Sequence, residues 1–310
     1  MVITNDIKNK LVTWAIAIRT KFLLSSIVAV ANGVIVALWK DGIFDPFYTI
    51  MTFLGVICLH ISVDLLNDYW DSKKGIDTNT IRTKFSGGTG VIPNKQLNAR
   101  SVLLAGIIFL ILGFLIGIYF VTVRGIAILI ILLFATAAVF FYSTQLVSFG
   151  MGELFVGIKG MMIVLGSYFV QTGFIDSSAI CMGVIIGIIS SSVIITTSFP
   201  DFVADKKSGR RTIVIILGKR KTSKIIPILI GMTYFLIILT VIYSLLPQTV
   251  LVSLLSLPIA LKAITLLLKE QDNLAKLVLI MHNVILYARI TGSLLFLGII
   301  FDIVTNHISL

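Results

Sequence analysis

Long apolar stretches separated by short polar segments dominate this chain. The stretches are rich in Leu, Ile, Val and Phe, and most have about 20 residues, the length that a helix needs to cross a bilayer. Continuous apolar runs exclude a closed β-barrel, whose strands alternate apolar and polar residues. The pattern predicts an all-α, polytopic membrane helix bundle of about nine transmembrane helices, at Phe22–Trp39, Pro46–Leu66, Ser101–Val123, Gly125–Val147, Glu153–Thr172, Ser178–Phe199, Ile225–Leu246, Thr249–Leu268 and Asn283–Val304.

The composition fits a membrane protein and excludes a soluble domain of this size. Of the 310 residues, 57% are hydrophobic and only 13% are charged, and the mean hydropathy is +1.06. We expect one transmembrane domain over 1–310, with a polar N-terminal segment at 1–21 and two long loops at 67–100 and 200–224. The two cysteines and three histidines form no cluster in the sequence, so neither a disulfide nor a zinc site is indicated.

The distribution of basic residues predicts the orientation in the membrane. If the N-terminus is cytoplasmic, 20 of the 25 Lys and Arg residues fall in cytoplasmic segments. We therefore expect an integral protein of the plasma membrane with its N-terminus and both long loops in the cytoplasm. The net charge of +11 then reflects topology and contact with anionic lipid, and no nucleic-acid partner is indicated.

Two clusters of aspartates stand at the ends of apolar runs, about 130 residues apart. In the first cluster, Asp64, Asn67, Asp68 and Asp71 have the spacing i, i+3, i+4 and i+7, which places them on one face if the helix continues. The second cluster has Asp201 and Asp205 at i and i+4. Carboxylates are costly near lipid, so paired clusters indicate a bound cation, and one or two Mg²⁺ ions that carry a diphosphate are the simplest ligand.

Each aspartate cluster is followed by basic residues suited to the remaining negative charge of a diphosphate. Lys is a point charge for phosphate and Arg binds it in a bidentate manner. A solvated loop at the membrane surface would explain either cluster alone, but two clusters at matching positions favour a site. The glycine-rich stretch Ser86–Gly90 could be an anion-binding loop or only a turn. The basic residues are Lys73, Lys74, Arg82, Lys84, Arg210 and Arg211.

These segments carry a family resemblance. The stretches Asn67-Asp-Tyr-Trp-Asp71 and Pro200-Asp-Phe-Val-Ala-Asp205, with Gly209-Arg-Arg-Thr212, resemble the two signature regions of the UbiA superfamily of intramembrane prenyltransferases. Among its branches, the Ser86-Gly-Gly-Thr-Gly90 stretch and the Gln171-Thr-Gly173 run resemble the 1,4-dihydroxy-2-naphthoate polyprenyltransferases of menaquinone biosynthesis. The resemblance implies a helix bundle around a central cavity open to the cytoplasm and to lipid.

The resemblance also implies the chemistry and its residues. A polyprenyl group passes from its diphosphate to an aromatic acceptor, with Mg²⁺ stabilising the leaving diphosphate. Carried over to this chain, the metal ligands are Asn67, Asp71, Asp201 and Asp205. The residues expected to contact the substrates are Arg19, Asp68, Lys73, Asp77, Arg82, Lys84 and Tyr142, with Tyr142 acting through its hydroxyl.

Departures from the family pattern leave the acceptor open. Gly75 stands where many members have a further aspartate, and Asp64 stands where related sequences commonly have Asn. The alternatives are a prenyltransferase for another quinone precursor, for a porphyrin or for an ether lipid. A transporter is the alternative from a different class, although the acidic residues lie near one mouth of the bundle and not at its middle. The sequence leaves the prenyl chain length and the oligomeric state open.

Overall fold

Apolar helices make up nearly all of the molecule. The computed structural model describes residues 2–76, 81–141 and 150–308, and within them it contains helices and no strands. Every predicted apolar run corresponds to a helix, which confirms the all-α membrane bundle. The helices are α2 (Thr20–Asp41), α3 (Pro46–Lys73), α4 (Ala99–Arg124), α5 (Ile126–Phe141), α6 (Gly152–Thr172), α7 (Ser177–Thr197), α10 (Lys219–Ile242), the 3₁₀ helix η2 (Gln248–Ser256) with α11 (Leu257–Glu270), and α12 (Leu274–Ile308).

Eight of the described segments are long and apolar enough to cross a membrane, with η2 and α11 forming one of them together. The apolar part of α5 is shorter and runs from Ile126 to Val139. The end of the fourth predicted run, which extends to Val147, lies outside the described residues. Three further helices were not predicted: α1 (Val2–Ala17), α8 (Phe202–Lys207) and α9 (Ile213–Leu217).

Helix α3 continues past the predicted end at Leu66 to Lys73. It starts at a regular N-cap, where the Asp45 side chain accepts a hydrogen bond of 2.9 Å from the Tyr48 N–H and Pro46 occupies the first turn. The extension adds the last two turns of the helix. It carries the first aspartate cluster on a regular helical scaffold, as the sequence spacing required.

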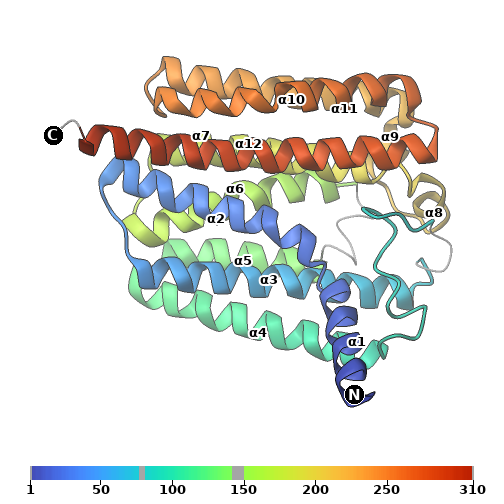
Figure 1. Ribbon diagram of the computed structural model, residues 1–310. Helices are drawn as coiled ribbons and strands as arrows, with labels where there is room; N and C mark the ends of the chain where they lie inside the picture. The colour runs from blue at the N-terminus through green and yellow to red at the C-terminus, as the bar shows by residue number, and fades with distance from the viewer. Residues whose placement is uncertain (1, 77–80, 142–149, 309–310) are drawn as a thin grey trace.

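The helices lie side by side, and their connections place both long loops at one end of the bundle (Figure 1). The chain between α3 and α4 lies at this end, together with α1, α8 and α9, whereas the end of α12 lies at the opposite end. Both aspartate clusters are therefore on the same side of the molecule. This is the arrangement that the distribution of basic residues predicts.

Glycines allow close contact between α6 and α7. A Cβ added at Gly187 would lie 2.7 Å from the carbonyl oxygen of Gly157, closer than real side chains approach a backbone. Without a hydrophobic force between helices in lipid, such small-residue contacts bring backbones together and increase van der Waals packing. The outer helix α4 buries few residues, and large apolar side chains such as Leu104, Ile108 and Leu115 are exposed on it.

Candidate active site

A cavity of about 460 Å³ lies within the bundle, and residues of both long loops contribute to its lining. Its walls come from α2 to α7 and from α12, and they are mostly apolar. The segment Phe85–Gly88 also lines it. Both aspartate clusters contribute to the same cavity, through Asp64, Asn67, Asp71, Asp201 and Asp205. All four predicted metal ligands therefore line the same cavity, although the two clusters that supply them are about 130 residues apart in the sequence.

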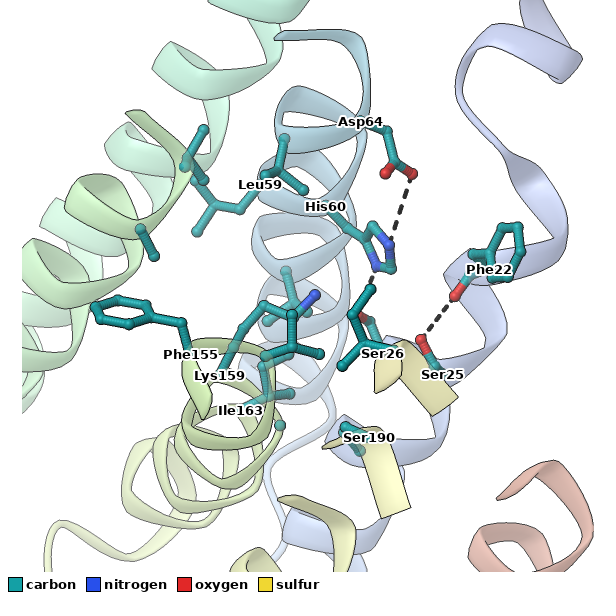
Figure 2. Close-up of a pocket in the computed structure, with 18 of the residues that line it drawn as sticks. Phe22, Ser25, Ser26, Leu59, His60, Asp64, Phe155, Lys159, Ile163 and Ser190 are labelled. Atoms are coloured by element: carbon teal, nitrogen blue, oxygen red, sulfur yellow. Dashed lines mark hydrogen bonds and ion pairs between the residues drawn. The ribbon is translucent and has the colours of Figure 1, made fainter. Parts of the chain in front are cut away.

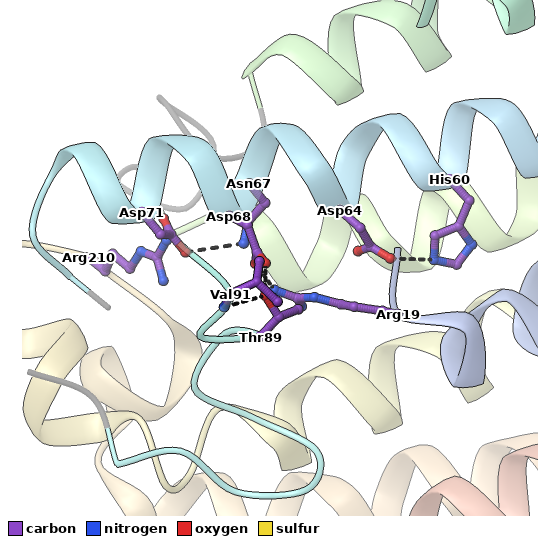
Figure 3. A network of polar contacts seen from close by, with 9 residues as sticks. All are labelled: Arg19, His60, Asp64, Asn67, Asp68, Asp71, Thr89, Val91 and Arg210. Atoms are coloured by element: carbon purple, nitrogen blue, oxygen red, sulfur yellow. Dashed lines mark hydrogen bonds and ion pairs between the residues drawn. The ribbon is translucent and has the colours of Figure 1, made fainter. Parts of the chain in front are cut away.

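Arg210 bridges the two clusters. Its guanidinium forms an ion pair with Asp71 Oδ1 from α3 and a second one, at 3.4 Å, with Asp205 Oδ1 from α8. Asn67 Nδ2 donates a hydrogen bond of 3.1 Å to the other oxygen of Asp71 (Figure 3). A positive charge therefore already lies between the two carboxylates that are expected to share a cation.

The second cluster is largely buried at the cavity, and one of its carboxylate oxygens has no hydrogen-bond partner. Burial, together with the neighbouring Asp205 carboxylate, raises the pKa of Asp201 to about 7. Burial also raises the pKa of Asp205, against the opposing effect of Arg210. The backbone N–H of Gly87 donates to Asp201, but Asp201 Oδ1 is buried without a hydrogen-bond partner. An unpartnered buried carboxylate oxygen is costly, so a cation at this position would stabilise the site.

The predicted metal ligands fit Mg²⁺ by their chemistry. They offer only carboxylate and amide oxygens, the hard donors that Mg²⁺ prefers, and Asp201 Oδ1 still has room for a partner. In the described part of the chain no three His, Cys, Asp or Glu side chains already converge as a closed metal site. The Arg210 guanidinium forms ion pairs with both Asp71 and Asp205, so it sets the separation between these two carboxylates.

Arg19 and Asp68 form a separate pair beside these residues. Arg19 Nη2 donates to Asp68 Oδ1 at 2.5 Å, and the Thr89 hydroxyl donates to the other Asp68 oxygen (Figure 3). Burial disfavours the charge of Arg19, but Asp68 and Asp64 outweigh it and raise its pKa further above the usual value. Arg19 lines the cavity, whereas both oxygens of Asp68 are occupied. Asp68 therefore holds Arg19 and the glycine-rich segment in place.

Three of the basic residues expected at the diphosphate lie on the outside of the loops. Lys73 is exposed and lies 5.0 Å from the centre of the Trp70 ring, and Lys84 stacks on Phe85 at 5.7 Å. Arg82 is also exposed and approaches Asn94. None of the three lines the cavity in this structure. Tyr142 and Asp77 lie outside the described residues, so their predicted contacts stay predictions.

Two further ionisable residues, His60 from α3 and Lys159 from α6, line the cavity. The sequence offers Lys159 as a candidate, because a lysine inside a span can reach a central cavity and contact a diphosphate or an acidic acceptor. His60 was not predicted, although its type alone, an ionisable residue inside a span, could have pointed to it. Glu153, also on α6, accepts a hydrogen bond of 2.9 Å from the Ile213 N–H and ties the loop after α8 to the bundle.

Comparison with known sequences identifies the family. The sequence profile described as the UbiA prenyltransferase family matches residues 24–285, which is most of the chain. The chain belongs to the UbiA prenyltransferase family. The resemblance predicted from the two aspartate motifs is thereby confirmed, the chain is a prenyltransferase, and the transporter alternative is set aside.

Similar proteins are known at modest identity. A 1,4-dihydroxy-2-naphthoate octaprenyltransferase of Bacillus subtilis (strain 168) is 25% identical over 250 residues, which are 79% of each chain. The Escherichia coli (strain K12) protein of the same name is 24% identical and covers 92% of this chain and 94% of its own. The structure of a UbiA homologue from Archaeoglobus fulgidus bound to DMAPP and Mg²⁺ superposes with a TM-score of 0.64 at 14% identity, covering 91% of this chain and 99% of that one. This last similarity establishes the UbiA prenyltransferase fold.

Proposed function

We propose that this UbiA prenyltransferase transfers a polyprenyl group from a polyprenyl diphosphate to 1,4-dihydroxy-2-naphthoate in menaquinone biosynthesis, and that the reaction depends on Mg²⁺. The observation that carries the proposal is the meeting of two aspartate clusters at one apolar cavity. Relatives from Bacillus subtilis and Escherichia coli are named for this acceptor, which supports the choice of naphthoate. A family structure bound to DMAPP and Mg²⁺ supports the donor and the metal.

Asn67, Asp71, Asp201 and Asp205 are the residues that would hold one or two Mg²⁺ ions. Bound there, Mg²⁺ supplies positive charge that stabilises the diphosphate as it leaves. Arg210 and Arg19 line the same region and are placed to bind diphosphate oxygens that the metal leaves free. The family resemblance also implies substrate-binding roles for Asp68, Asp77 and Tyr142, and for Lys73, Arg82 and Lys84, which do not line the cavity in this structure.

The cavity walls complete the proposed reaction. The prenyl chain lies along apolar side chains that exclude water, so the allylic carbon is protected from hydrolysis while its C–O bond breaks. The electron pair of that bond leaves with the diphosphate. A ring carbon of the acceptor supplies the pair for the new C–C bond, and the ring regains aromaticity by releasing the proton of the attacked carbon. The products are diphosphate and a prenylated aromatic compound.

We further propose that the protein lies in the plasma membrane with its N-terminus and its active site toward the cytoplasm. The distribution of basic residues supports this orientation. The substrates are then the partners of the protein, together with membrane lipid.

Product analysis tests the proposal directly. The purified protein in lipid nanodiscs is incubated with Mg²⁺, geranylgeranyl diphosphate and one acceptor at a time, and lipid products are identified by mass spectrometry. We expect a prenylated naphthalene from 1,4-dihydroxy-2-naphthoate that disappears with EDTA and returns with added Mg²⁺. If product forms with 4-hydroxybenzoate, homogentisate or a glycerol-phosphate lipid and not with the naphthoate, that compound is the acceptor and the proposed acceptor is wrong. Turnover that is unchanged in EDTA would contradict the metal-dependent mechanism.

A further inference from the structure

Two polar side chains, His60 and Lys159, line the cavity beside Asp64, the first residue of the first aspartate cluster. His60 and Asp64 project from α3, and Lys159 projects from α6 into the same pocket (Figure 2). His60 precedes Asn67 by seven residues, which is about 10 Å along a helix. Asp64 stands about one helical turn, and His60 about two turns, before Asn67 on α3.

Two of these side chains have unmet hydrogen-bonding capacity. Asp64 Oδ2 is buried without a hydrogen-bond partner, and its distance of 3.7 Å to His60 Nε2 is longer than a hydrogen bond. Lys159 interacts with Asp64 only through space, and no hydrogen bond or ion pair within 4.0 Å joins it to any described residue. His60 is held from the other side, because its Nδ1 lies 2.7 Å from the hydroxyl of Ser26 on α2.

The surroundings of this group are apolar. Leu59, Phe155 and Ile163 line the pocket next to Lys159 (Figure 2). An ammonium and a carboxylate left without partners among such side chains are costly unless a ligand completes them. A prenyl tail cannot do so, since it has neither donor nor acceptor. The ligand that fits is flat and apolar, with an anionic group for Lys159 and a hydrogen-bond donor for Asp64.

We propose that Lys159 and the His60–Asp64 pair form the acceptor-binding subsite, and that it selects aromatic acids with a hydroxyl next to the carboxylate. Lys159 binds the acceptor carboxylate and Asp64 Oδ2 accepts a hydrogen bond from the hydroxyl, while His60, fixed by its hydrogen bond to Ser26, lies beside Asp64. The ring then extends toward the diphosphate end of the cavity. The inference rests on the proposed function for the presence of an aromatic acceptor, and it adds the residues that recognise it.

Equilibrium binding tests the subsite without turnover. The protein in nanodiscs, with Mg²⁺ and a non-reactive prenyl thiolodiphosphate present, is titrated with 1-hydroxy-2-naphthoate, 2-naphthoate and 1-naphthol, and ligand fluorescence is recorded. A charge-assisted hydrogen bond corresponds to about tenfold or more in affinity. We expect the wild type to prefer 1-hydroxy-2-naphthoate over 1-naphthol by about that factor, Lys159→Met to lose this preference and Lys159→Arg to keep it. Asp64→Ala should lose the preference over 2-naphthoate instead.

A matched control uses another lysine within a span. Lys262 on α11 is exposed and does not line the cavity, so Lys262→Met should leave all three affinities unchanged. Binding of the thiolodiphosphate confirms that each variant is folded. The subsite would be wrong if Lys159→Met kept the wild-type preference for 1-hydroxy-2-naphthoate over 1-naphthol. It would also be wrong if Lys159→Met weakened only the binding of the thiolodiphosphate. If the protein binds the three ligands as expected but makes no prenylated product, the proposed function is wrong and the binding subsite stands.

Discussion

Asp201 illustrates how a single buried carboxylate determines what the cavity can bind. Its Oδ1 has no hydrogen-bond partner, and burial raises its pKa to about 7, so the charged form of this carboxylate is disfavoured when no cation is bound. A cation at this oxygen would displace the proton and remove the cost of burying the charge. Asp201 is therefore more sensitive to replacement than its position at the end of a loop suggests.

Asp201→Asn should abolish turnover while leaving the protein folded. The amide keeps the shape but removes the negative charge that a divalent cation needs, so we expect kcat to fall by about 100-fold or more. The measurement is prenyl transfer by the purified variant, with thermal unfolding as the test of folding. Asp272→Asn is the matched control, because Asp272 is 78% exposed and pairs only with Lys219 at 3.6 Å. Near-full activity of Asp201→Asn would remove this residue from the metal site.

Arg210 should hold the metal-free site together. Its guanidinium joins Asp71 and Asp205, so Arg210→Gln leaves two carboxylates facing each other without a cation. Breaking a buried pair by removing one partner costs about 3 kcal/mol or more. We expect Arg210→Gln to unfold at a lower temperature without Mg²⁺ and to gain more stability from added Mg²⁺ than the wild type. Thermal unfolding in nanodiscs, with and without Mg²⁺, measures both effects.

Arg211→Gln separates this effect from a general loss of charge. Arg211 is the next residue, but it is exposed and does not line the cavity. Its variant should behave as the wild type in both conditions. If Arg210→Gln and Arg211→Gln respond equally to Mg²⁺, the guanidinium bridge has no role in the stability of the metal-free site.

The acidic side of the site could be predicted from the sequence because helical spacing fixes it. Asn67 and Asp71 are four residues apart, and α3 continues through both, so they share a face as expected. The basic side could not be predicted in the same way. Lys73, Arg82 and Arg210 each follow an aspartate motif in the sequence, but tertiary contacts decide which of these three turns inward, and Arg210 is the one that lines the cavity. Lys159 and His60 line the same cavity from two different helices, and no local sequence pattern predicts that they do so.

Among the elements, α6 and α7 form a contact that depends on the absence of side chains. Gly187→Val should destabilise their contact, because the new Cβ would lie 2.7 Å from the backbone oxygen of Gly157 and a backbone cannot move aside as a side chain can. Overpacking of this kind costs about 1–3 kcal/mol. We expect a lower unfolding temperature in nanodiscs and reduced prenyl transfer, since both helices line the cavity.

The same substitution on another helix provides the control. Gly231 lies within α10, and a Cβ added there would meet nothing within 4 Å. Gly231→Val therefore changes helix propensity equally without forcing two helices apart, and it should unfold close to the wild type. A similar loss of stability in both variants would assign the effect to propensity and not to the α6–α7 contact.

For the whole molecule, the arrangement of the helices and the distribution of charge lead to one orientation. The loops that carry both aspartate clusters lie at one end of the bundle, and the end of α12 lies at the other (Figure 1). Of the 25 Lys and Arg residues, 20 belong to segments on the side of the loops. Because basic residues are retained in the cytoplasm, the loops should face inward and the C-terminus outward.

Reporter fusions test this orientation. Alkaline phosphatase, which is active only outside the cytoplasm, should be active when fused after Leu310 and inactive when fused after Arg100, at the start of α4 just after the first loop. A fluorescent protein that matures only in the cytoplasm should give the opposite result at the same two sites. Phosphatase activity at Arg100 would place the carboxylates outside, where cytoplasmic diphosphates could not reach them. The proposed donor would then have to approach from the lipid or from the other side of the membrane.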